Sequence, residues 1–171
     1  MTLHRRVSAL AAAVTLIGTL VPAGAAVAAP KPGGTIAFKD MYGVQYTVRS
    51  DGYYDPAQGA YDMQPEAGHR FVAVLVTVTN RSQRHSTSDD ANNDMTLVGA
   101  NDQTYMSTVE SVTECTDFDA GEYHLAPGES ATGCVAFQLP ATLRFVAIKW
   151  SPGGGMLGEA FGEWKVTGDH P

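Results

Sequence analysis

Basic residues are scarce in this sequence, and no long apolar run occurs beyond its first 28 residues. Of the 11 Lys and Arg residues, 9 follow residue 28, whereas all 18 Asp and Glu residues do. This acidic balance opposes binding to nucleic acid or to an anionic membrane, which both need clusters of Lys and Arg. No later apolar stretch approaches the roughly 20 residues that cross a bilayer as a helix. We therefore expect no transmembrane segment and no nucleic-acid partner.

The early apolar run has the pattern of a secretory signal. A short basic region at residues 4–6 precedes an apolar stretch at 7–21, and Ala26-Val27-Ala28 fits the A-x-A cleavage motif. We predict a signal peptide over residues 1–28, because cleavage one residue later would place a proline first. The rest then divides into a flexible Pro/Gly-rich start (29–34), one β-sandwich domain (35–167) and a tail (168–171). We expect the mature protein to be secreted and extracellular.

Cysteine is scarce as well, with only two in the chain. Neither lies near the cleavage site, so we expect no lipid anchor. In an exported chain, two cysteines predict one disulfide, here between Cys115 and Cys134. It would close a loop of about 20 residues and stabilise the fold by roughly 3 kcal/mol. The alternative is a pair of free thiols for catalysis or metal binding, with His124 as the only histidine between them.

Motifs of enzymes and cofactor sites are missing. The sequence has no Gly-x-Ser-x-Gly elbow and no His-x-x-x-His spacing. The histidines beyond the signal are scattered, at His69, His85, His124 and His170. We expect no catalytic residues and no cofactor.

Helical periodicity is absent beyond the signal, and alternation by two takes its place. The strongest run covers residues 71–79, where four valines share one face and Phe71, Ala73 and Leu75 occupy part of the other. This pattern predicts a central strand covered on both sides. Further strands are expected at residues 42–49, 95–98, 103–109, 133–139, 142–150 and 161–166. Seven to eight short strands separated by turn residues predict an immunoglobulin-like antiparallel β-sandwich.

The cysteine positions differ from those of a true immunoglobulin domain, where the core Trp lies between two cysteines far apart in sequence. Here the two are 19 positions apart, and both Trp residues follow the second. We expect this disulfide to fasten the long polar connection at residues 111–123 to the neighbouring strand.

Two segments resemble the signature halves of a known family. They are Gly68-His69-Arg70-Phe71-Val72-Ala73-Val74 with its continuation to Asn80, and Leu125-Ala126-Pro127-Gly128-Glu129 with the strand Gly133 to Pro140. Together they resemble the telokin-like, immunoglobulin-fold domain of unknown function found in secreted proteins and lipoproteins of Gram-positive bacteria. The resemblance covers residues 35–166 and implies the sandwich fold but no catalytic residues. Many members carry a lipobox, which this chain lacks.

The acidic segment at residues 88–94 is the best candidate for a metal site. Asp90, Asn92 and Asp94 reproduce the D-x-N-x-D start of a calcium loop. The pattern then fails, because Met95 replaces the glycine of the sixth position and Asn101 the glutamate of the twelfth. A solvated loop capped by side-chain oxygens is the preferred interpretation.

A long segment at residues 50–68 is the favoured binding surface. It carries Tyr53, Tyr54 and Tyr61 among several acids, and tyrosines on a loop give contact area at modest entropy cost. We expect a monomeric, non-catalytic module that binds an unidentified protein or cell-envelope component through its loops. The alternatives are a calcium-binding extracellular domain or an unrecognised enzyme using residues 90–94, and a purely structural protein that binds nothing.

Overall fold

The computed structural model of the protein describes residues 33–40, 42–155 and 161–167. The predicted signal peptide and the C-terminal tail lie outside these residues. Strands dominate, and the expected immunoglobulin-like antiparallel β-sandwich is confirmed. The strands are β1 (Thr35–Lys39), β2 (Gln45–Ala57), β3 (His69–Asn80), β4 (Thr87–Asp90), β5 (Met95–Gly99), β6 (Thr104–Thr108), β7 (Glu122–Leu125), β8 (Ser130–Pro140), β9 (Phe145–Trp150) and β10 (Gly162–Lys165). The short helices are η1 (Ala60–Asp62), α1 (Ala91–Asp94) and η2 (Pro152–Gly155).

Strand β3 occupies the centre of the fold, as its sequence predicts. It pairs antiparallel with β2 on one side and with β8 on the other, so that Val74 lies opposite both Tyr53 and Val135. Its four alternating valines are fully buried in the main core. Phe71 and Ala73 on its other face are buried in a second, smaller cluster. Both faces of this strand are therefore covered.

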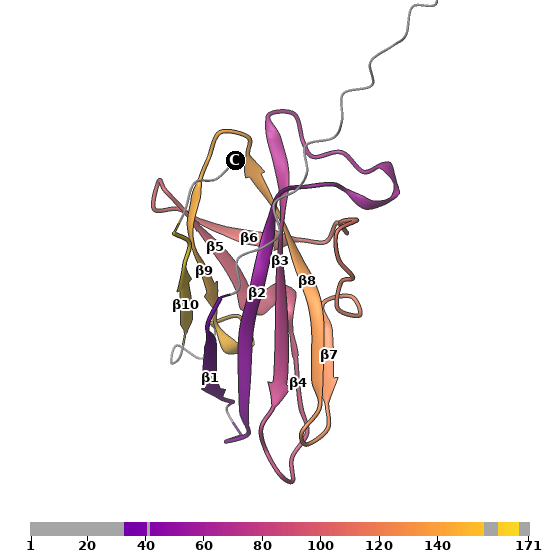
Figure 1. Ribbon diagram of the computed structural model, residues 1–171, viewed down its shortest axis with the longest axis vertical. Coiled ribbons are helices and arrows are strands. Elements are labelled where there is room, and N and C mark those ends of the chain that lie inside the picture. The colour runs from indigo at the N-terminus through magenta and orange to yellow at the C-terminus, as the bar shows by residue number, and fades with distance from the viewer. Residues whose placement is uncertain (1–32, 41, 156–160, 168–171) are drawn as a thin grey trace, which may run out of the picture.

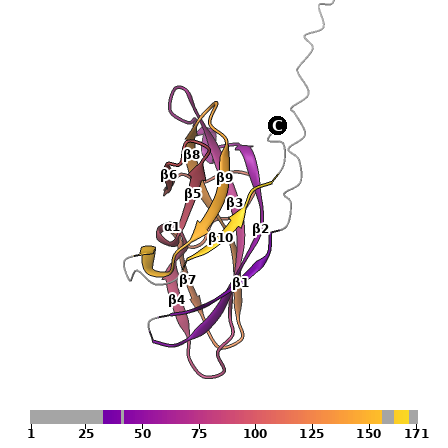
Figure 2. The ribbon, with the colours of Figure 1, turned by 90° about the vertical axis from the view of Figure 1, so that its left-hand side faces the viewer.

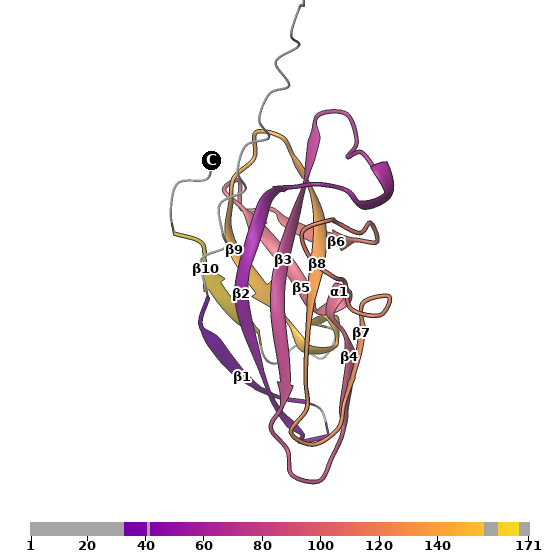
Figure 3. The same cartoon turned by 45° about the vertical axis from the view of Figure 1, so that its right-hand side comes forward.

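The strands follow the order β1-β2-β3-β8-β6-β5-β9-β10 and fold into two layers. Figures 1 and 3 show β2, β3 and β8 in front of β5 and β9. Strand β6 joins the layers, because Ser107 and Thr108 pair with Phe137 and Ala136 of β8 while the start of β6 pairs with β5. Strands β4 and β7 form a separate two-stranded sheet.

On the side of the sandwich away from β6, the two layers end in β1 and β10. These two strands lie next to each other in Figure 2. The indole Nε1 of Trp164 donates a hydrogen bond to the carbonyl of Gly34, at 2.6 Å. Gly162 lies against Ile36 and Phe38, and a Cβ there would come within 2.7 Å of the Phe38 ring. This close approach brings the two edge strands together without backbone pairing.

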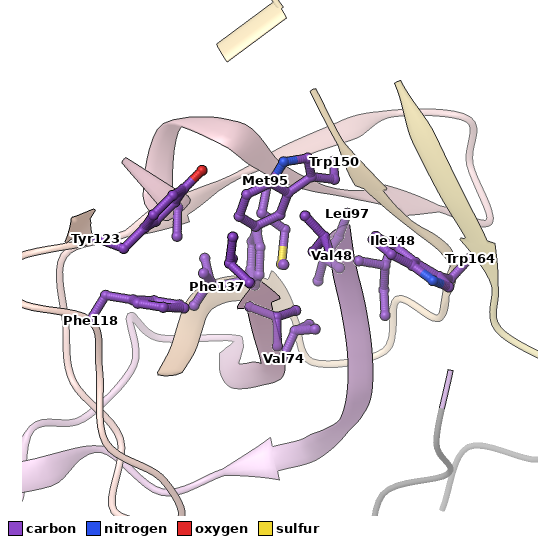
Figure 4. Close-up of a cluster of buried hydrophobic side chains, with 14 of the residues drawn as sticks. Val48, Val74, Met95, Leu97, Phe118, Tyr123, Phe137, Ile148, Trp150 and Trp164 are labelled. Atoms are coloured by element: carbon purple, nitrogen blue, oxygen red, sulfur yellow. The ribbon is translucent and has the colours of Figure 1, made fainter. Parts of the chain in front are cut away.

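Apolar side chains from both layers meet in one main core, shown in Figure 4. Trp150, Phe137, Leu97 and Met95 are fully buried there, and the predicted inward positions of β8 belong to the same cluster. Fully burying side chains of this size contributes about 1.5–3 kcal/mol each. This core is the main source of stability for the surface that it carries.

Some predicted boundaries are wrong. Residues 50–57 were expected in a loop, yet they continue β2, because Tyr53 and Tyr54 pair with Val74 and Ala73 across two bulges. Tyr42 was expected in a strand but lies in the turn before β2, with 84% of its surface exposed. Strands β1, β4 and β7 were not predicted from the sequence.

Candidate functional site

The predicted disulfide between Cys115 and Cys134 is present, with 6.0 Å between the two Cα atoms. It attaches the connection between β6 and β7 (residues 109–121) to the middle of β8. The backbone N–H of Cys134 also donates to the carbonyl of Thr116, at 2.9 Å. The expected role of this disulfide, to fasten a long polar connection to its neighbouring strand, is confirmed.

The same connection covers the outer face of β3 and β8. Val112 is buried in the second apolar cluster, against Phe71 and Ala136. Phe118 is buried in the main core and packs on Gly133, so the connection inserts apolar side chains at two points. These insertions and the disulfide hold residues 109–121 in one position.

The shortened loop between β2 and β3 (residues 58–68) is attached to this connection. The N–H of Ala60 donates to the carbonyl of Ser111, and the N–H of Thr113 donates to the carbonyl of Gln58, both at 2.9 Å. A β-bridge joins Gly59 to Val112. The two segments lie beside each other at one side of the sandwich (Figure 1). We call residues 58–68 and 109–121 together the paired connections.

The three candidate tyrosines are not gathered on one surface. Tyr53 is half-buried, and its ring meets the edge of Phe145 at a centroid distance of 4.9 Å. Tyr54 is also half-buried and packs against the second apolar cluster. Only Tyr61 projects into solvent, with 92% of its surface exposed. The structure thus leaves one of the three on an exposed loop.

A second exposed apolar side chain, Val109, was not identified from the sequence. It is 93% exposed at the start of the β6–β7 connection. The alternation of residues 103–109 had placed it in a strand, but β6 ends at Thr108. Two residues later, the carbonyl of Ser111 accepts a hydrogen bond from the N–H of Ala60, which precedes Tyr61 in the chain. The two exposed side chains therefore project from the paired connections.

A cavity of about 260 Å³ lies between the β6–β7 connection, α1 and β8. Its apolar lining includes Phe118, Cys134 and Ala136, whereas Glu110 and Asp117 bring two carboxylates. The remaining lining residues are Asn92, Thr108, Val109, Ser111, Ala120 and Gly121. No Lys, Arg or His belongs to this lining. No sequence motif predicts the cavity, because it forms only where segments distant in the chain meet.

The acidic segment caps a helix instead of forming a calcium loop. Asp90 accepts hydrogen bonds from the N–H groups of Asn92 and Asn93 and from the side-chain amide of Asn93. It is the N-cap of α1, a position that favours such oxygens. Across residues 33–40, 42–155 and 161–167, no group of three or more His, Cys, Asp or Glu side chains is placed to hold a metal ion.

Asp94 contradicts the expectation of a solvated loop, because only 1% of its surface is exposed. One carboxylate oxygen accepts from the N–H of Gly154, whereas the other is buried and has no hydrogen-bond partner among the described residues. Burial raises the pKa of Asp94 from its ordinary value of 3.8 to about 8. Burial also raises the pKa of Tyr46 and of Tyr123, which lie in the same core. The raised pKa favours the neutral form of this structural carboxyl at pH 7.

The histidines are scattered in the structure too. His69 begins β3 and is half-exposed, whereas His85 and His124 are exposed. His124 lies 3.6 Å from Glu122, its neighbour but one in β7. His170 falls outside the described residues. None of the helices in the described part of the chain is long and apolar enough to cross a membrane.

Comparison with known proteins gives distant structural likenesses and one family. No curated protein matches the sequence. MPT63, a secreted protein of Mycobacterium tuberculosis, is 14% identical with a TM-score of 0.49, over 70% of this chain and 86% of that one. A putative lipoprotein of Bacillus subtilis, ycdA, is 15% identical with a TM-score of 0.49, over 70% of this chain and 36% of that one.

A functionally unknown protein of Listeria monocytogenes is 14% identical with a TM-score of 0.41, over 68% of this chain and 74% of that one. A family model, by contrast, matches more than half of the chain. The match covers most of the sandwich, from the end of β1 into β9. Residues 39–147 match the model of the family described as a domain of unknown function (DUF4352), and the chain belongs to this family.

Proposed function

We propose that the protein is a secreted, non-catalytic β-sandwich module that binds a protein or another cell-envelope component through its paired connections. One observation carries this proposal: Tyr61 and Val109 are 92% and 93% exposed on two segments that the fold holds in place. Single exposed apolar side chains are common on soluble proteins, but exposed apolar side chains on adjoining segments are typical of interaction sites.

The rigidity of the surface favours binding. The paired connections are joined by two backbone hydrogen bonds and a β-bridge, and the Cys115–Cys134 disulfide anchors them to β8. A surface that is already ordered loses little conformational entropy when a partner binds. An exposed tyrosine adds a large contact area with only two side-chain torsions.

Charge narrows the class of partner. Asp62 and Glu66 are exposed on the same loop as Tyr61, and the whole chain has a formal net charge of −7. Such a surface repels nucleic acid and anionic lipid. The partner we expect is a neutral or basic patch on a protein or envelope component. The disulfide and the secretory pattern at the N-terminus support an extracellular location.

A capture experiment with matched tyrosine variants tests the proposal. The immobilised wild type is expected to retain a specific component from an envelope extract of the source organism, and Tyr61→Ala and Val109→Ser are expected to lose it. Tyr42→Ala is the control, because Tyr42 is 84% exposed but lies in the β1–β2 turn, at the other end of the molecule (Figure 1). All variants should keep the wild-type melting temperature. Equal recovery by all four proteins, or no specific capture by wild type, would contradict the proposal.

A further inference from the structure

The cavity beside the disulfide combines an apolar floor with acidic walls. Phe118, Cys134 and Ala136 are each less than 7% exposed, so the floor belongs to the packed core. Glu110 and Asp117 come from two separate points of the β6–β7 connection. This combination suits a ligand with an apolar body and a cationic end.

Glu110 contributes a carboxylate that is already partly removed from water. Its Oε2 atom is shielded from solvent and has no hydrogen-bond partner within the described part of the chain, so it acts on a ligand through its charge and not by direct contact. A charge in such surroundings is screened less than one on the open surface, and its attraction to an entering cation is stronger. With no Lys, Arg or His in the lining, nothing in the cavity neutralises the two carboxylates.

The walls of the cavity are held in place by contacts on every side. Asp117 forms a β-bridge with Cys134, and Thr108 pairs with Ala136. The carbonyl of Gly121 accepts from the N–H of Ala91, at 2.8 Å. The cavity therefore exists before a ligand enters, and binding does not have to order it.

Size and chemistry select among possible ligands. At about 260 Å³ the cavity is smaller than the 300–1,000 Å³ typical of sites for drug-sized molecules, so it suits a group the size of one side chain. Calcium needs six to eight oxygen ligands, more than two carboxylates provide. An anion would meet the two negative charges. A primary ammonium on a short alkyl chain satisfies both the acidic walls and the apolar floor.

We propose that this cavity binds an alkylammonium group, either a free small amine or the side chain of a lysine-like residue on a partner. The inference does not depend on Tyr61 or on the capture of an envelope component. It assigns a second, chemically distinct site, lined largely by the β6–β7 connection itself.

An NMR titration of the ¹⁵N-labelled protein tests the site with two amines. The probes are n-butylammonium for a free amine and Nα-acetyl-lysine N-methylamide for a side chain. Saturable shifts are expected at the amides of Ser111, Asp117 and Gly121. Butan-1-ol and butyrate, which share the alkyl chain, should bind at least about tenfold more weakly, because a charge-assisted hydrogen bond is lost. Binding of both amines would show that a side chain fits, and binding of butylammonium alone would assign the site to free amines.

Variants locate the effect. Glu110→Gln and Asp117→Asn should each weaken butylammonium binding by about tenfold while the spectrum stays dispersed. Asp102→Asn, in the exposed turn between β5 and β6, should leave it unchanged. Tyr61→Ala should also bind the amine normally, which separates this site from the proposed partner surface. Absence of saturation with both amines, equal affinity for butan-1-ol, or unchanged binding in both cavity variants would overturn the proposal.

Discussion

The Oδ1 atom of Asp94 accepts a hydrogen bond of 2.9 Å from the backbone N–H of Gly154, in the turn that follows β9. Asp89 accepts from the neighbouring N–H of Gly153 in the same way. Two carboxylates from the β4–α1 region thus hold the glycine turn. Gly153 and Gly154 both have positive φ angles, of 62° and 65°, which glycine adopts without steric cost. The acidic residues that resemble a calcium loop in sequence therefore bind part of their own chain.

The buried carboxyl of Asp94 predicts that stability falls as pH rises. Its pKa is raised from 3.8 to about 8 in the folded protein, so between pH 4 and 8 the native state holds a proton that the unfolded state has lost. The free energy of unfolding should then decrease across this window, by at most about 1.4 kcal/mol per pH unit, and level off above it. The Asp94→Asn variant has no carboxyl to titrate, so this pH-dependent decrease in the free energy of unfolding is absent. Urea unfolding at pH 5 and pH 8 should show the variant gaining stability relative to wild type at the higher pH.

The matched control for this measurement is Asp102→Asn, which removes an exposed carboxylate. Its stability relative to wild type should not change between the two pH values. If Asp94→Asn behaves like this control, the carboxyl is not neutral in the folded protein.

Loss of Arg70 should destabilise the fold strongly. Its guanidinium contacts both carboxylate oxygens of Asp55, at 2.5 and 2.8 Å, and also donates to the carbonyls of Pro140 and Leu143. The Asp55 side chain is only 3% exposed, and removing one member of a buried ion pair costs about 3–5 kcal/mol. Arg70→Met should lower the free energy of unfolding by that amount in urea titrations.

Arg49→Met provides the comparison, because Arg49 pairs with Asp51 while 55% of its side chain is exposed. Surface pairs of this kind contribute at most about 1 kcal/mol. A similar decrease in the free energy of unfolding in both arginine variants would show that the buried pair contributes no more to stability than the surface pair.

A methyl group at Gly133 should disturb the attachment of the β6–β7 connection. A Cβ there would lie 2.7 Å from the Phe118 ring, closer than packed atoms allow. We expect Gly133→Ala to cost about 1–3 kcal/mol, as overpacking does, whereas Gly34→Ala has no atom within 4 Å of its Cβ and should change stability by less than about 0.5 kcal/mol. Melting temperatures of the two variants decide this, and equal values would refute the packing argument.

Loss of the disulfide should loosen the same connection. The Cys115→Ala/Cys134→Ala double variant removes a cross-link with a sequence separation of 19, which should lower the free energy of unfolding by roughly 3 kcal/mol. Hydrogen exchange should accelerate at residues 109–121 more than in β3. Reductant should reproduce the effect in wild type and leave the double variant unchanged. Slow exchange throughout the connection in the double variant would show that Val112 and Phe118 suffice to hold it.

Local patterns in the sequence were enough to predict the scaffold. The alternation around Val74 predicted a central strand because successive side chains in a strand point to opposite faces of the sheet. The presence of Cys115 and Cys134 predicted a disulfide, since two cysteines in an exported chain allow only one pairing within the chain. Neither inference needs to know which distant segment lies alongside.

The site depends on distant pairing, which local patterns do not contain. Tyr53 and Tyr61 look alike in a tyrosine-rich segment, but the backbone pairing of β2 with β3 continues as far as Ala57, which leaves only Tyr61 in the loop. Asp90 and Asp94 likewise share one acidic motif, yet the first caps a helix at the surface and the second is buried against Gly154.

The sequence by itself therefore determined an acidic β-sandwich with one disulfide, because strand periodicity, charge and cysteine count are properties of short segments or of composition. Only the tertiary structure decided which side chains are exposed, that the two connections pair through Ala60 and Ser111, and that Glu110 and Asp117 share a cavity. These features arise when segments that are separate in the chain pack together. Their free energy comes from contacts between those segments and not from the propensity of either one.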